Sequence, residues 1–249
     1  YDILEVNELA RVLDNAQTDM LKTDELRRDL MANVSHDLKT PLTMIKAYAE
    51  MVRDLSYRDD IKRTNHCNII MDEVDRLNLL VSDILTLSKM QANADTIILE
   101  EFDLIGEVKT IINRYEIIKE TEAYHFVLNM PKKAIVVADK AKLNQVIYNL
   151  VNNAINYTGE DKTVTLSVKK EKDSFLVEIK DTGKGINKEE IDFIWNKYYK
   201  NNKNHQRNVV GTGLGLSIVK TILEKHQFKY GVKSIKNKGT TFYFYVKKK

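Results

Sequence analysis

The first part of this sequence is short of residues that break helices. All nine glycines lie from Gly106 onward, and Pro41 is the only proline before that point. A long stretch without glycine and with one proline predicts long helices, whereas the remainder must supply the turns, strands and loops. Together with the length of 249 residues, this contrast predicts two domains.

Cysteine and long apolar runs are also scarce. Cys67 is the single cysteine, which excludes an intrachain disulfide, agrees with a reducing compartment and predicts a buried thiol on an apolar helix face. No apolar run approaches the roughly 18 residues of a membrane span, and no signal-peptide pattern opens the chain. Because the chain begins with Tyr1, we expect a cytosolic piece of a longer protein, with any membrane segment upstream.

Neither sign of charge dominates. The 39 basic and 36 acidic residues are mixed along the chain and leave a net charge of +3, which does not favour nucleic acid as a partner. The hydrophobic content of 43% is sufficient for a core in each of two domains.

Residues 1–21 carry apolar side chains at steps of three and four, as in a coiled-coil seam: Ile3, Val6, Leu9, Leu13, Ala16 and Met20. This pattern predicts a signalling helix that enters from upstream. The charged stretch KTDELRRD at residues 22–29 interrupts the seam. It is consistent with a loosely packed solvated segment and equally with a joint that transmits an input.

The stretch from Met31 to Met51 predicts a helix with one exposed imidazole. At about 100° per residue, its apolar positions form one stripe and His36 lies on the opposite, polar side. Asp37 can accept the Nδ1 hydrogen of this imidazole, which leaves Nε2 as a nucleophile. Pro41 removes a backbone donor one turn beyond His36 and bends the helix there.

A second helix is predicted from about Ile61 to Gln91, with this core set: Cys67, Ile70, Val74, Leu77, Val81, Ile84 and Ser88. Two helices with wide apolar stripes cannot bury both stripes against each other alone. A dimer of two hairpins, forming an all-α four-helix bundle, is the expected solution for residues 22–94.

After a polar hinge at residues 91–96, strands and helices are interleaved without strict alternation. This pattern predicts an α/β sandwich with a mixed sheet over residues 95–249. The predicted strands are Ile97 to Phe102, His125 to Asn129, Ala134 to Ala138, Thr163 to Lys169, Phe175 to Asp181, Tyr230 to Ile235 and Thr241 to Val246. The predicted helices are Leu104 to Thr121, Lys140 to Tyr157, Lys188 to Trp195 and Leu214 to His226.

Two stretches of this second domain carry oxygen ligands. Asn149 and Asn153, four residues apart, share one helix face and offer neutral oxygens to one Mg²⁺ ion, which takes its other ligands from water and phosphates. Asp181 follows a strand and can accept a hydrogen bond from an exocyclic amino group. Gly183 and Gly185 allow close approach of the backbone, although a plain β-turn would have the same sequence.

A third stretch, GTGLGL, leads into the helix from Leu214. Gly211, Gly213 and Gly215 let successive backbone N–H groups face an anion, and the helix N-terminus favours negative charge. The remaining histidines have no ligand spacing, so we expect no transition-metal site.

The joint occurrence of these motifs, in this order, resembles the bacterial sensor histidine kinases. SHDLKTPL resembles the H-box, NLVNNAINYT the N-box, DTGKGI the G1 box, IWNKYYK the F-box and GTGLGL the G2 box, and GTTF completes the pattern. The resemblance implies catalytic roles for His36, Asp37 and Thr40. It also implies an ATP and Mg²⁺ site formed by Asn149, Asn153, Tyr157, Asp181, Gly183, Gly185, Tyr199, Lys200, Gly211, Gly213, Leu214, Gly215 and Thr241.

Some positions depart from the family pattern. Trp195 stands for phenylalanine, Lys200 for arginine, and Asn156 for a basic residue. Lysine neutralises phosphate as a point charge but cannot bind it in a fork.

The expected activity is an ATP-dependent protein histidine kinase that phosphorylates itself at His36. It would pass the phosphoryl group to an aspartate of a response regulator, and Thr40 predicts phosphatase activity as well. The expected form is a homodimer, the cytoplasmic portion of a bacterial membrane sensor. A clamp or hydrolase of the gyrase and chaperone type needs a glutamate where this chain has Asn149, and a catalytically dead scaffold is the third alternative.

Overall fold

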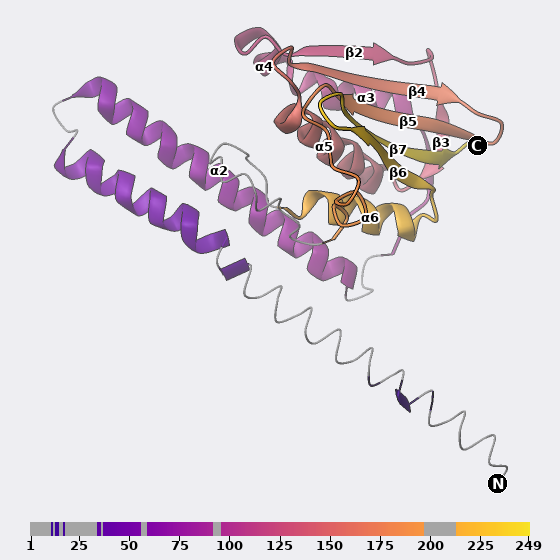
Figure 1. The fold of residues 1–249 in the computed structure, drawn as a ribbon, viewed down its shortest axis with the longest axis horizontal. Helices are drawn as coiled ribbons and strands as arrows, with labels where there is room; N and C mark the ends of the chain where they lie inside the picture. The colour runs from indigo at the N-terminus through magenta and orange to yellow at the C-terminus, as the bar shows by residue number, and fades with distance from the viewer. Residues whose placement is uncertain are drawn as a thin grey trace. The chain divides into compact units, whose positions relative to one another are not determined.

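The computed structural model describes residues 11, 13, 14, 17, 34, 35, 37–55, 59–91, 96–196 and 213–249. The chain divides into two compact units, Tyr1–Leu80 and Val81–Lys249, and the division falls inside the long helix α2 (Figure 1). Most of the predicted coiled-coil seam, the charged stretch at residues 22–29 and residues 92–95 of the predicted hinge lie outside the described residues.

The first unit contains a helical hairpin, as predicted. One helix covers residues 37–54, and α2 (Asp60–Gln91) returns alongside it (Figure 1). Asp59 caps α2, because its Oδ1 accepts from the Lys62 N–H at 3.0 Å. Pro41 lies inside the first helix and is buried. Tyr48 and His66 connect the two helices through their rings, whose centroids are 5.3 Å apart.

The predicted core set of α2 lies on two different stripes. Ile70, Leu77 and Ile84 are half-buried, whereas Val74 and Val81 are 41% and 46% exposed. The prediction of a buried Cys67 is wrong, because the thiol is exposed. Cys67, Met71, Val74, Asn78, Val81 and Leu85 are all exposed and follow one another at steps of four and three, a second apolar stripe that we call the α2 seam.

The second unit contains the predicted mixed sheet. The strands are β1 (Glu100–Asp103), β2 (His125–Asn129), β3 (Ile135–Ala138), β4 (Thr163–Lys170), β5 (Ser174–Asp181), β6 (Tyr230–Ile235) and β7 (Gly239–Lys247). Five of them form a sheet in the order β2-β4-β5-β7-β6, and β1 pairs with β3 separately. The β2–β4 pair is parallel, and the other pairs are antiparallel.

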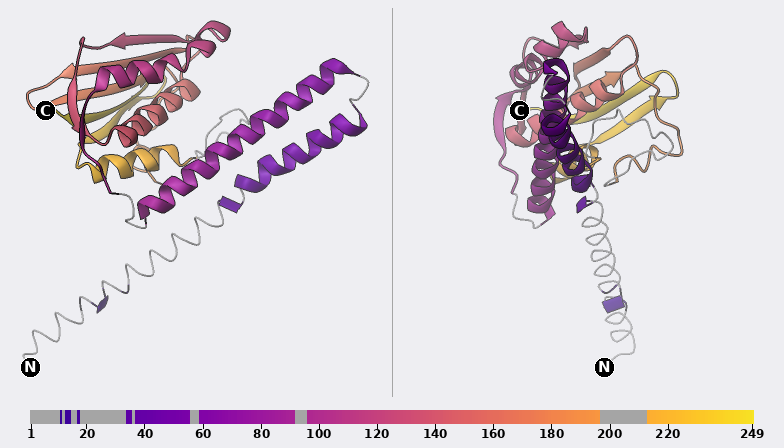
Figure 2. Two further views of the ribbon diagram at one scale, coloured as in Figure 1. Left: turned by 180° about the vertical axis from the view of Figure 1, so that it is seen from behind. Right: turned by 90° about the vertical axis from the view of Figure 1, so that its left-hand side faces the viewer.

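Helices cover one face of this sheet (Figure 2). They are α3 (Leu104–Asn113), α5 (Lys140–Tyr157) and α6 (Gly215–Lys225), with the short α4 (Glu116–Thr121) following α3. The apolar side of each long helix is buried against the sheet, and the core between the layers includes Leu143, Ile147, Leu150, Ile218, Ile222 and Phe244, each less than 2% exposed. Burial of one such side chain contributes about 1.5–3 kcal/mol.

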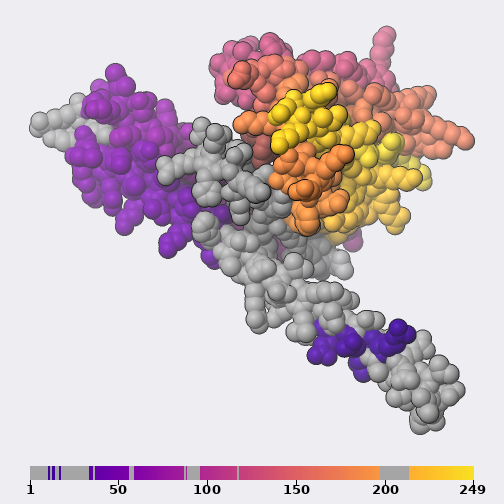
Figure 3. All heavy atoms as spheres, viewed as in Figure 1, coloured from indigo at the N-terminus to yellow at the C-terminus, as the bar shows by residue number. Residues whose placement is uncertain are grey.

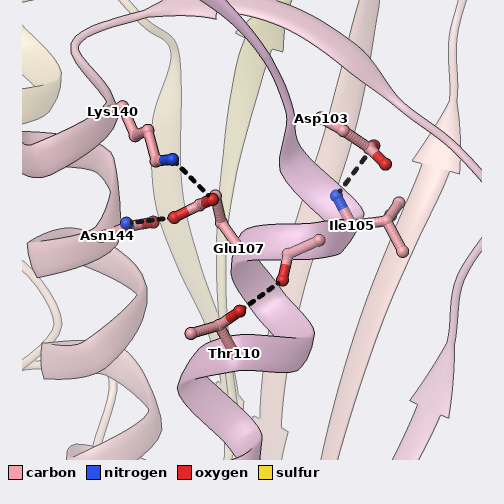
Figure 4. Close-up of polar contacts among 7 residues, drawn as sticks. Asp103, Ile105, Glu107, Thr110, Lys140 and Asn144 are labelled. Carbon is pink, nitrogen blue, oxygen red and sulfur yellow. Dashed lines mark hydrogen bonds and ion pairs between the residues drawn. The ribbon is translucent and has the colours of Figure 1, made fainter.

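Polar contacts fix α3 against α5 (Figure 4). Asp103 caps α3 by accepting from the Ile105 N–H at 3.2 Å. Glu107 accepts from Lys140 Nζ at 2.9 Å and from Asn144 Nδ2 at 2.6 Å, so one carboxylate connects α3 with two turns of α5. Further along, the Tyr115 hydroxyl donates to Asn152 Oδ1 at 2.7 Å.

Three other predictions are corrected by the structure. The single helix predicted from Leu104 to Thr121 is interrupted at Arg114 and Tyr115, whose amides bond to carbonyls three residues back. The helix predicted from Lys188 to Trp195 is a series of turns. The first predicted strand is also shorter, because it begins at Glu100.

Candidate nucleotide site

The final turns of α5 bring the predicted asparagines to one face. Asn149 and Asn153 are both half-buried, and Tyr157 at the end of the helix is 52% exposed. The Nδ2 atom of Asn149 is buried and has no hydrogen-bond partner in the described part of the chain. A buried amide group without a partner costs about 1–3 kcal/mol, so this position is suited to a ligand that supplies the missing contact.

Asp181 lies at the end of β5 and is only 2% exposed. Its Oδ1 accepts from the Gly183 N–H at 2.9 Å and from the Thr240 N–H at 3.1 Å. Burial raises the pKa of the Asp181 carboxyl, and these two N–H groups act in the opposite direction. Because both bonds are to Oδ1, the other oxygen is left to accept from a ligand donor.

The turn between β6 and β7 packs on the glycine loop after Asp181. The Asn237 N–H donates to the Lys184 carbonyl at 2.7 Å, and the Ile186 N–H donates to Ser234 Oγ at 2.8 Å. Gly185 has φ +68°, and a Cβ there would lie 2.3 Å from the Ile235 carbonyl oxygen. Figure 3 shows the orange segment that includes this loop against the yellow hairpin of β6 and β7.

The start of α6 is a helix N-terminus that presents backbone N–H groups. Leu214 is the N-cap residue and makes no side-chain capping bond, and Gly213 before it has φ +71°. The first N–H groups of a helix have no partner inside the helix and favour an anion. Gly215 lies beside Asn149, because a Cβ built on Gly215 would be 3.8 Å from Asn149 Cγ. The N-terminus of α6 therefore lies next to the asparagine face of α5.

Trp195 anchors the end of the described segment that follows the glycine loop. Its ring packs edge-on against Tyr230 and Phe242, at centroid distances of 5.0 and 5.7 Å. These contacts with β6 and β7 give a physical reason why residues 188–195 do not continue as the predicted helix.

The structure brings Thr240, not Thr241, to Asp181. Thr240 is buried with Phe242 and Phe244 on the helix-covered face of β7, and its N–H bonds Asp181. Thr241 is half-buried and points to the other face by strand alternation. The alternation of buried Phe242 and Phe244 was the signal in the sequence that could have identified Thr240.

On the first unit, Asp37 is half-buried and Thr40 is exposed on the helix of residues 37–54. The predicted residues His36, Tyr199, Lys200 and Gly211 lie outside the described residues. The structure thus brings together Asn149, Asn153, Tyr157, Asp181, Gly183, Gly185, Gly213, Leu214 and Gly215 around the ends of α5, β5 and α6.

This arrangement fits a nucleotide held with Mg²⁺. The two asparagines offer neutral oxygen ligands, the α6 N-terminus offers N–H groups for phosphate, and Asp181 offers an acceptor for an amino group. Among the described residues, no group of three histidine, cysteine, aspartate or glutamate side chains is placed to hold a metal ion. In the same part of the chain, no helix combines the length and apolar content of a membrane span.

Comparison with known families agrees with both halves of the chain. Residues 138–249 match the family described as histidine kinase-, DNA gyrase B-, and HSP90-like ATPase. Residues 26–93 match the His Kinase A (phospho-acceptor) domain. The chain belongs to the bacterial sensor histidine kinase family. The candidate nucleotide site lies within the first of these two matches, and the helical hairpin lies within the second.

Two relatives are sensor protein kinases named WalK from Staphylococcus aureus. One is 34% identical over 229 residues, and the match covers 91% of this chain and 37% of the relative. The other is 35% identical over 230 residues and covers 91% of this chain and 55% of the relative. The chain therefore spans about a third to a half of the length of these relatives.

Solved histidine kinase structures share the fold. The histidine kinase ThkA in complex with the response regulator protein TrrA has a TM-score of 0.71 at 25% identity, covering 89% of this chain and 61% of that one. The Acinetobacter baumannii histidine kinase AdeS has a TM-score of 0.67 at 22% identity, covering 86% of this chain and 98% of that one.

Proposed function

We propose that this chain is an ATP-dependent protein histidine kinase that autophosphorylates His36 and passes the phosphoryl group to an aspartate of a response regulator. The observation that carries the proposal is the buried Asp181 carboxylate. Its Oδ1 is fixed by the N–H groups of Gly183 and Thr240, so the second oxygen is oriented to accept from the adenine amino group. A guanine base, which has a carbonyl at that position, would be rejected by the same oxygen.

The phosphate end is proposed to lie between α5 and the start of α6. Asn149 and Asn153 would hold Mg²⁺, and the backbone N–H groups from Gly213 to Gly215 would bind phosphate oxygens. Mg²⁺, when bound, supplies neutralisation of phosphate charge. Tyr157 would lie against the adenine, and Tyr199, Lys200 and Gly211 are proposed as further phosphate contacts.

The chemical step is proposed to take place at Nε2 of His36. The Nε2 lone pair forms the new N–P bond, the bond between the γ-phosphorus and the bridging oxygen breaks, and ADP leaves with that electron pair. Asp37 accepts the Nδ1 hydrogen, keeps Nε2 unprotonated and stabilises the imidazolium that forms. Positioning supplies most of the rate, because the protein does little covalent chemistry itself.

The α2 seam supports a homodimer. Its exposed apolar side chains recur at the steps of a coiled-coil interface, and the hairpin alone leaves them in water. We propose that residues 22–94 form the dimerisation and phosphotransfer domain as half of a four-helix bundle. Residues 95–249 are proposed as the catalytic domain and residues 1–21 as a signalling helix.

The partners are proposed from the relatives. ThkA is solved in complex with a response regulator protein, which supports a receiver domain as the acceptor for this kinase. The WalK relatives are sensor protein kinases longer than this chain. We infer that this chain is the cytoplasmic portion of a bacterial membrane sensor, and that Thr40 also orients water for dephosphorylation of the regulator.

The test is incubation of the purified chain with γ-labelled ATP and Mg²⁺, followed by acid treatment. Phosphohistidine is acid-labile, whereas phosphoserine is not. The parent chain is expected to incorporate acid-labile label, and His36→Gln is expected to lose it while it still binds ATP. His125→Gln, at an exposed position of β2, is the matched control and is expected to label like the parent. Acid-labile label on His36→Gln would contradict the assignment.

A further inference from the structure

A histidine connects the C-terminal end of α6 to the N-terminal end of α5. His226 is the C-cap residue of α6, and its Nε2 accepts from the Asp139 N–H at 3.0 Å. Its Nδ1 lies 2.8 Å from the Ile222 carbonyl oxygen. Because the Asp139 amide can only donate and the Ile222 carbonyl can only accept, these contacts assign the neutral imidazole with the hydrogen on Nδ1.

Asp139 is the N-cap residue of α5 and is 6% exposed. Its Oδ1 accepts from the Lys142 N–H at 3.0 Å, and its Oδ2 accepts from the Ile98 N–H at 3.1 Å. The same residue therefore joins the start of α5, the end of α6 and the segment that enters β1. Both carboxylate oxygens are used, so the bond from the Asp139 amide to His226 is a separate attachment.

The N-terminal end of α6 and the middle of α5 meet at the proposed phosphate site. Gly215 at the start of α6 lies beside Asn149 in the middle of α5. From Asp139 to Asn149 the helix rises by about 15 Å, and from His226 back to Gly215 it rises by about 16 Å. These nearly equal lengths show that α5 and α6 run antiparallel and in register, with one contact near each end. A slide of one residue would move the α6 N-terminus by about 1.5 Å.

We propose that His226 is a positioning residue for the nucleotide site. Its bond to the Asp139 amide sets the register of α6 along α5, and that register places the first N–H groups of α6 opposite Asn149 and Asn153. This role rests on the proposed function, because the position of the first α6 N–H groups matters only if they bind the phosphates of ATP. The adenine end depends on Asp181, Gly183 and Thr240, which belong to the sheet and its loop.

The decisive comparison is between two substitutions of different length. Glutamine places its side-chain oxygen near the position of Nε2 and can still accept from the Asp139 amide. Asparagine reaches only as far as Nδ1 and cannot. We expect His226→Asn to weaken ATP binding about tenfold, the effect of one lost hydrogen bond together with an unsatisfied buried amide. His226→Gln is expected to bind ATP within about twofold of the parent.

The readout separates positioning from general stability. ATP and adenosine are titrated into the full chain by calorimetry. His226→Asn is expected to lose affinity for ATP while its affinity for adenosine is unchanged, because only the phosphates contact the α6 N-terminus. Val168→Ala, which leaves a cavity on β4 between β2 and β5, is the matched control. It is expected to lower the melting temperature and to leave both affinities unchanged.

Each result decides between alternatives. The positioning role would be overturned if His226→Asn lost as much affinity for adenosine as for ATP. It would also be overturned if Val168→Ala lost as much affinity for ATP as His226→Asn. If His226→Asn does not fold, His226→Gln decides. A tenfold loss of affinity for ATP in a folded His226→Gln would also overturn the positioning role. Failure of the parent to bind ATP would instead overturn the proposed function.

Discussion

Gly183 lies directly against the main chain of Tyr157. A Cβ built on Gly183 would be 1.7 Å from the Tyr157 carbonyl oxygen, a distance at which no side chain fits. The loop after β5 therefore packs backbone to backbone on the end of α5. This contact brings Asp181 next to the last turn of the helix that carries both asparagines.

Gly183→Ala is expected to destabilise the chain by more than about 4 kcal/mol and to abolish ATP binding, because the loop must move away from α5. Urea denaturation followed by circular dichroism measures the change. Gly106→Ala is the control, since nothing lies within 4 Å of a Cβ at that helical glycine. It is expected to stabilise the chain by about 0.5–1 kcal/mol. Equal stability of Gly183→Ala and the parent would contradict the close packing of the Gly183 loop on α5.

Asp181→Asn is expected to weaken ATP binding about ten- to a hundredfold, because an amide donor would face the adenine amino group. The same substitution has a pH-dependent effect on stability. Burial raises the pKa of Asp181 in the folded chain, so the parent loses stability as the pH rises from the ordinary carboxyl range through that raised pKa. The asparagine variant has no such loss.

Two measurements check this prediction. Calorimetric titration gives the affinity for ATP, and urea denaturation at a series of pH values gives the free energy of unfolding. The free energy of unfolding of Asp181→Asn, relative to that of the parent, should be higher at neutral pH than at acidic pH. Unchanged affinity for ATP would argue against the adenine-reading role, and identical pH profiles would contradict the raised pKa of Asp181.

Asn153→Ala is expected to remove the Mg²⁺-dependent part of ATP binding, because it deletes one of the two proposed oxygen ligands. Calorimetry with and without Mg²⁺ measures that part. The control is Asn152→Ala on the neighbouring helix face, where the Oδ1 accepts from the Tyr115 hydroxyl. That variant should lose about 1 kcal/mol of stability and keep its Mg²⁺-dependent affinity. If Asn152→Ala lost the Mg²⁺-dependent affinity and Asn153→Ala kept it, the Mg²⁺ ligand would lie on the face of α5 that carries Asn152.

Val74→Glu is expected to convert the proposed homodimer into monomers, because it buries a charge in the α2 seam. Analytical ultracentrifugation measures the mass. Asn65→Glu adds the same charge on an exposed part of α2 away from the seam and should remain dimeric. A Val74→Glu variant that stays dimeric would mean that the seam is not the interface.

Thr40→Ala is expected to keep autophosphorylation of His36 and to lose most phosphatase activity, because dephosphorylation needs a positioned water rather than the imidazole. Purified phospho-regulator is mixed with ADP and each variant, and release of phosphate is followed with time. Thr43→Ala is the control, since the Thr43 hydroxyl donates to the Lys39 carbonyl at 2.8 Å within its own helix. If Thr40→Ala releases phosphate from the regulator as fast as the parent does, the phosphatase role of Thr40 is contradicted and only the kinase reaction remains proposed.

Much of the architecture could be predicted because it follows from local chemistry. The absence of glycine before Gly106 predicted the helical hairpin, and the cap residues Asp59, Asp103 and Asp139 lie where helices begin. The prediction of one helix from Leu104 to Thr121 was wrong because local periodicity does not report a change to a tighter turn. The prediction of a buried Cys67 does not hold for the single chain, because two apolar stripes on one helix look alike in sequence.

The sequence by itself determined the helix and strand types, the order of the motifs and the residue types available for nucleotide binding, because these depend on neighbours within a few positions. Only the tertiary structure decided that Thr240 rather than Thr241 meets Asp181. It also decided that His226 meets Asp139 and that Gly215 meets Asn149. Those contacts join residues far apart in the chain, and they form only when the packing of α5, α6 and the sheet sets which faces meet and in which register.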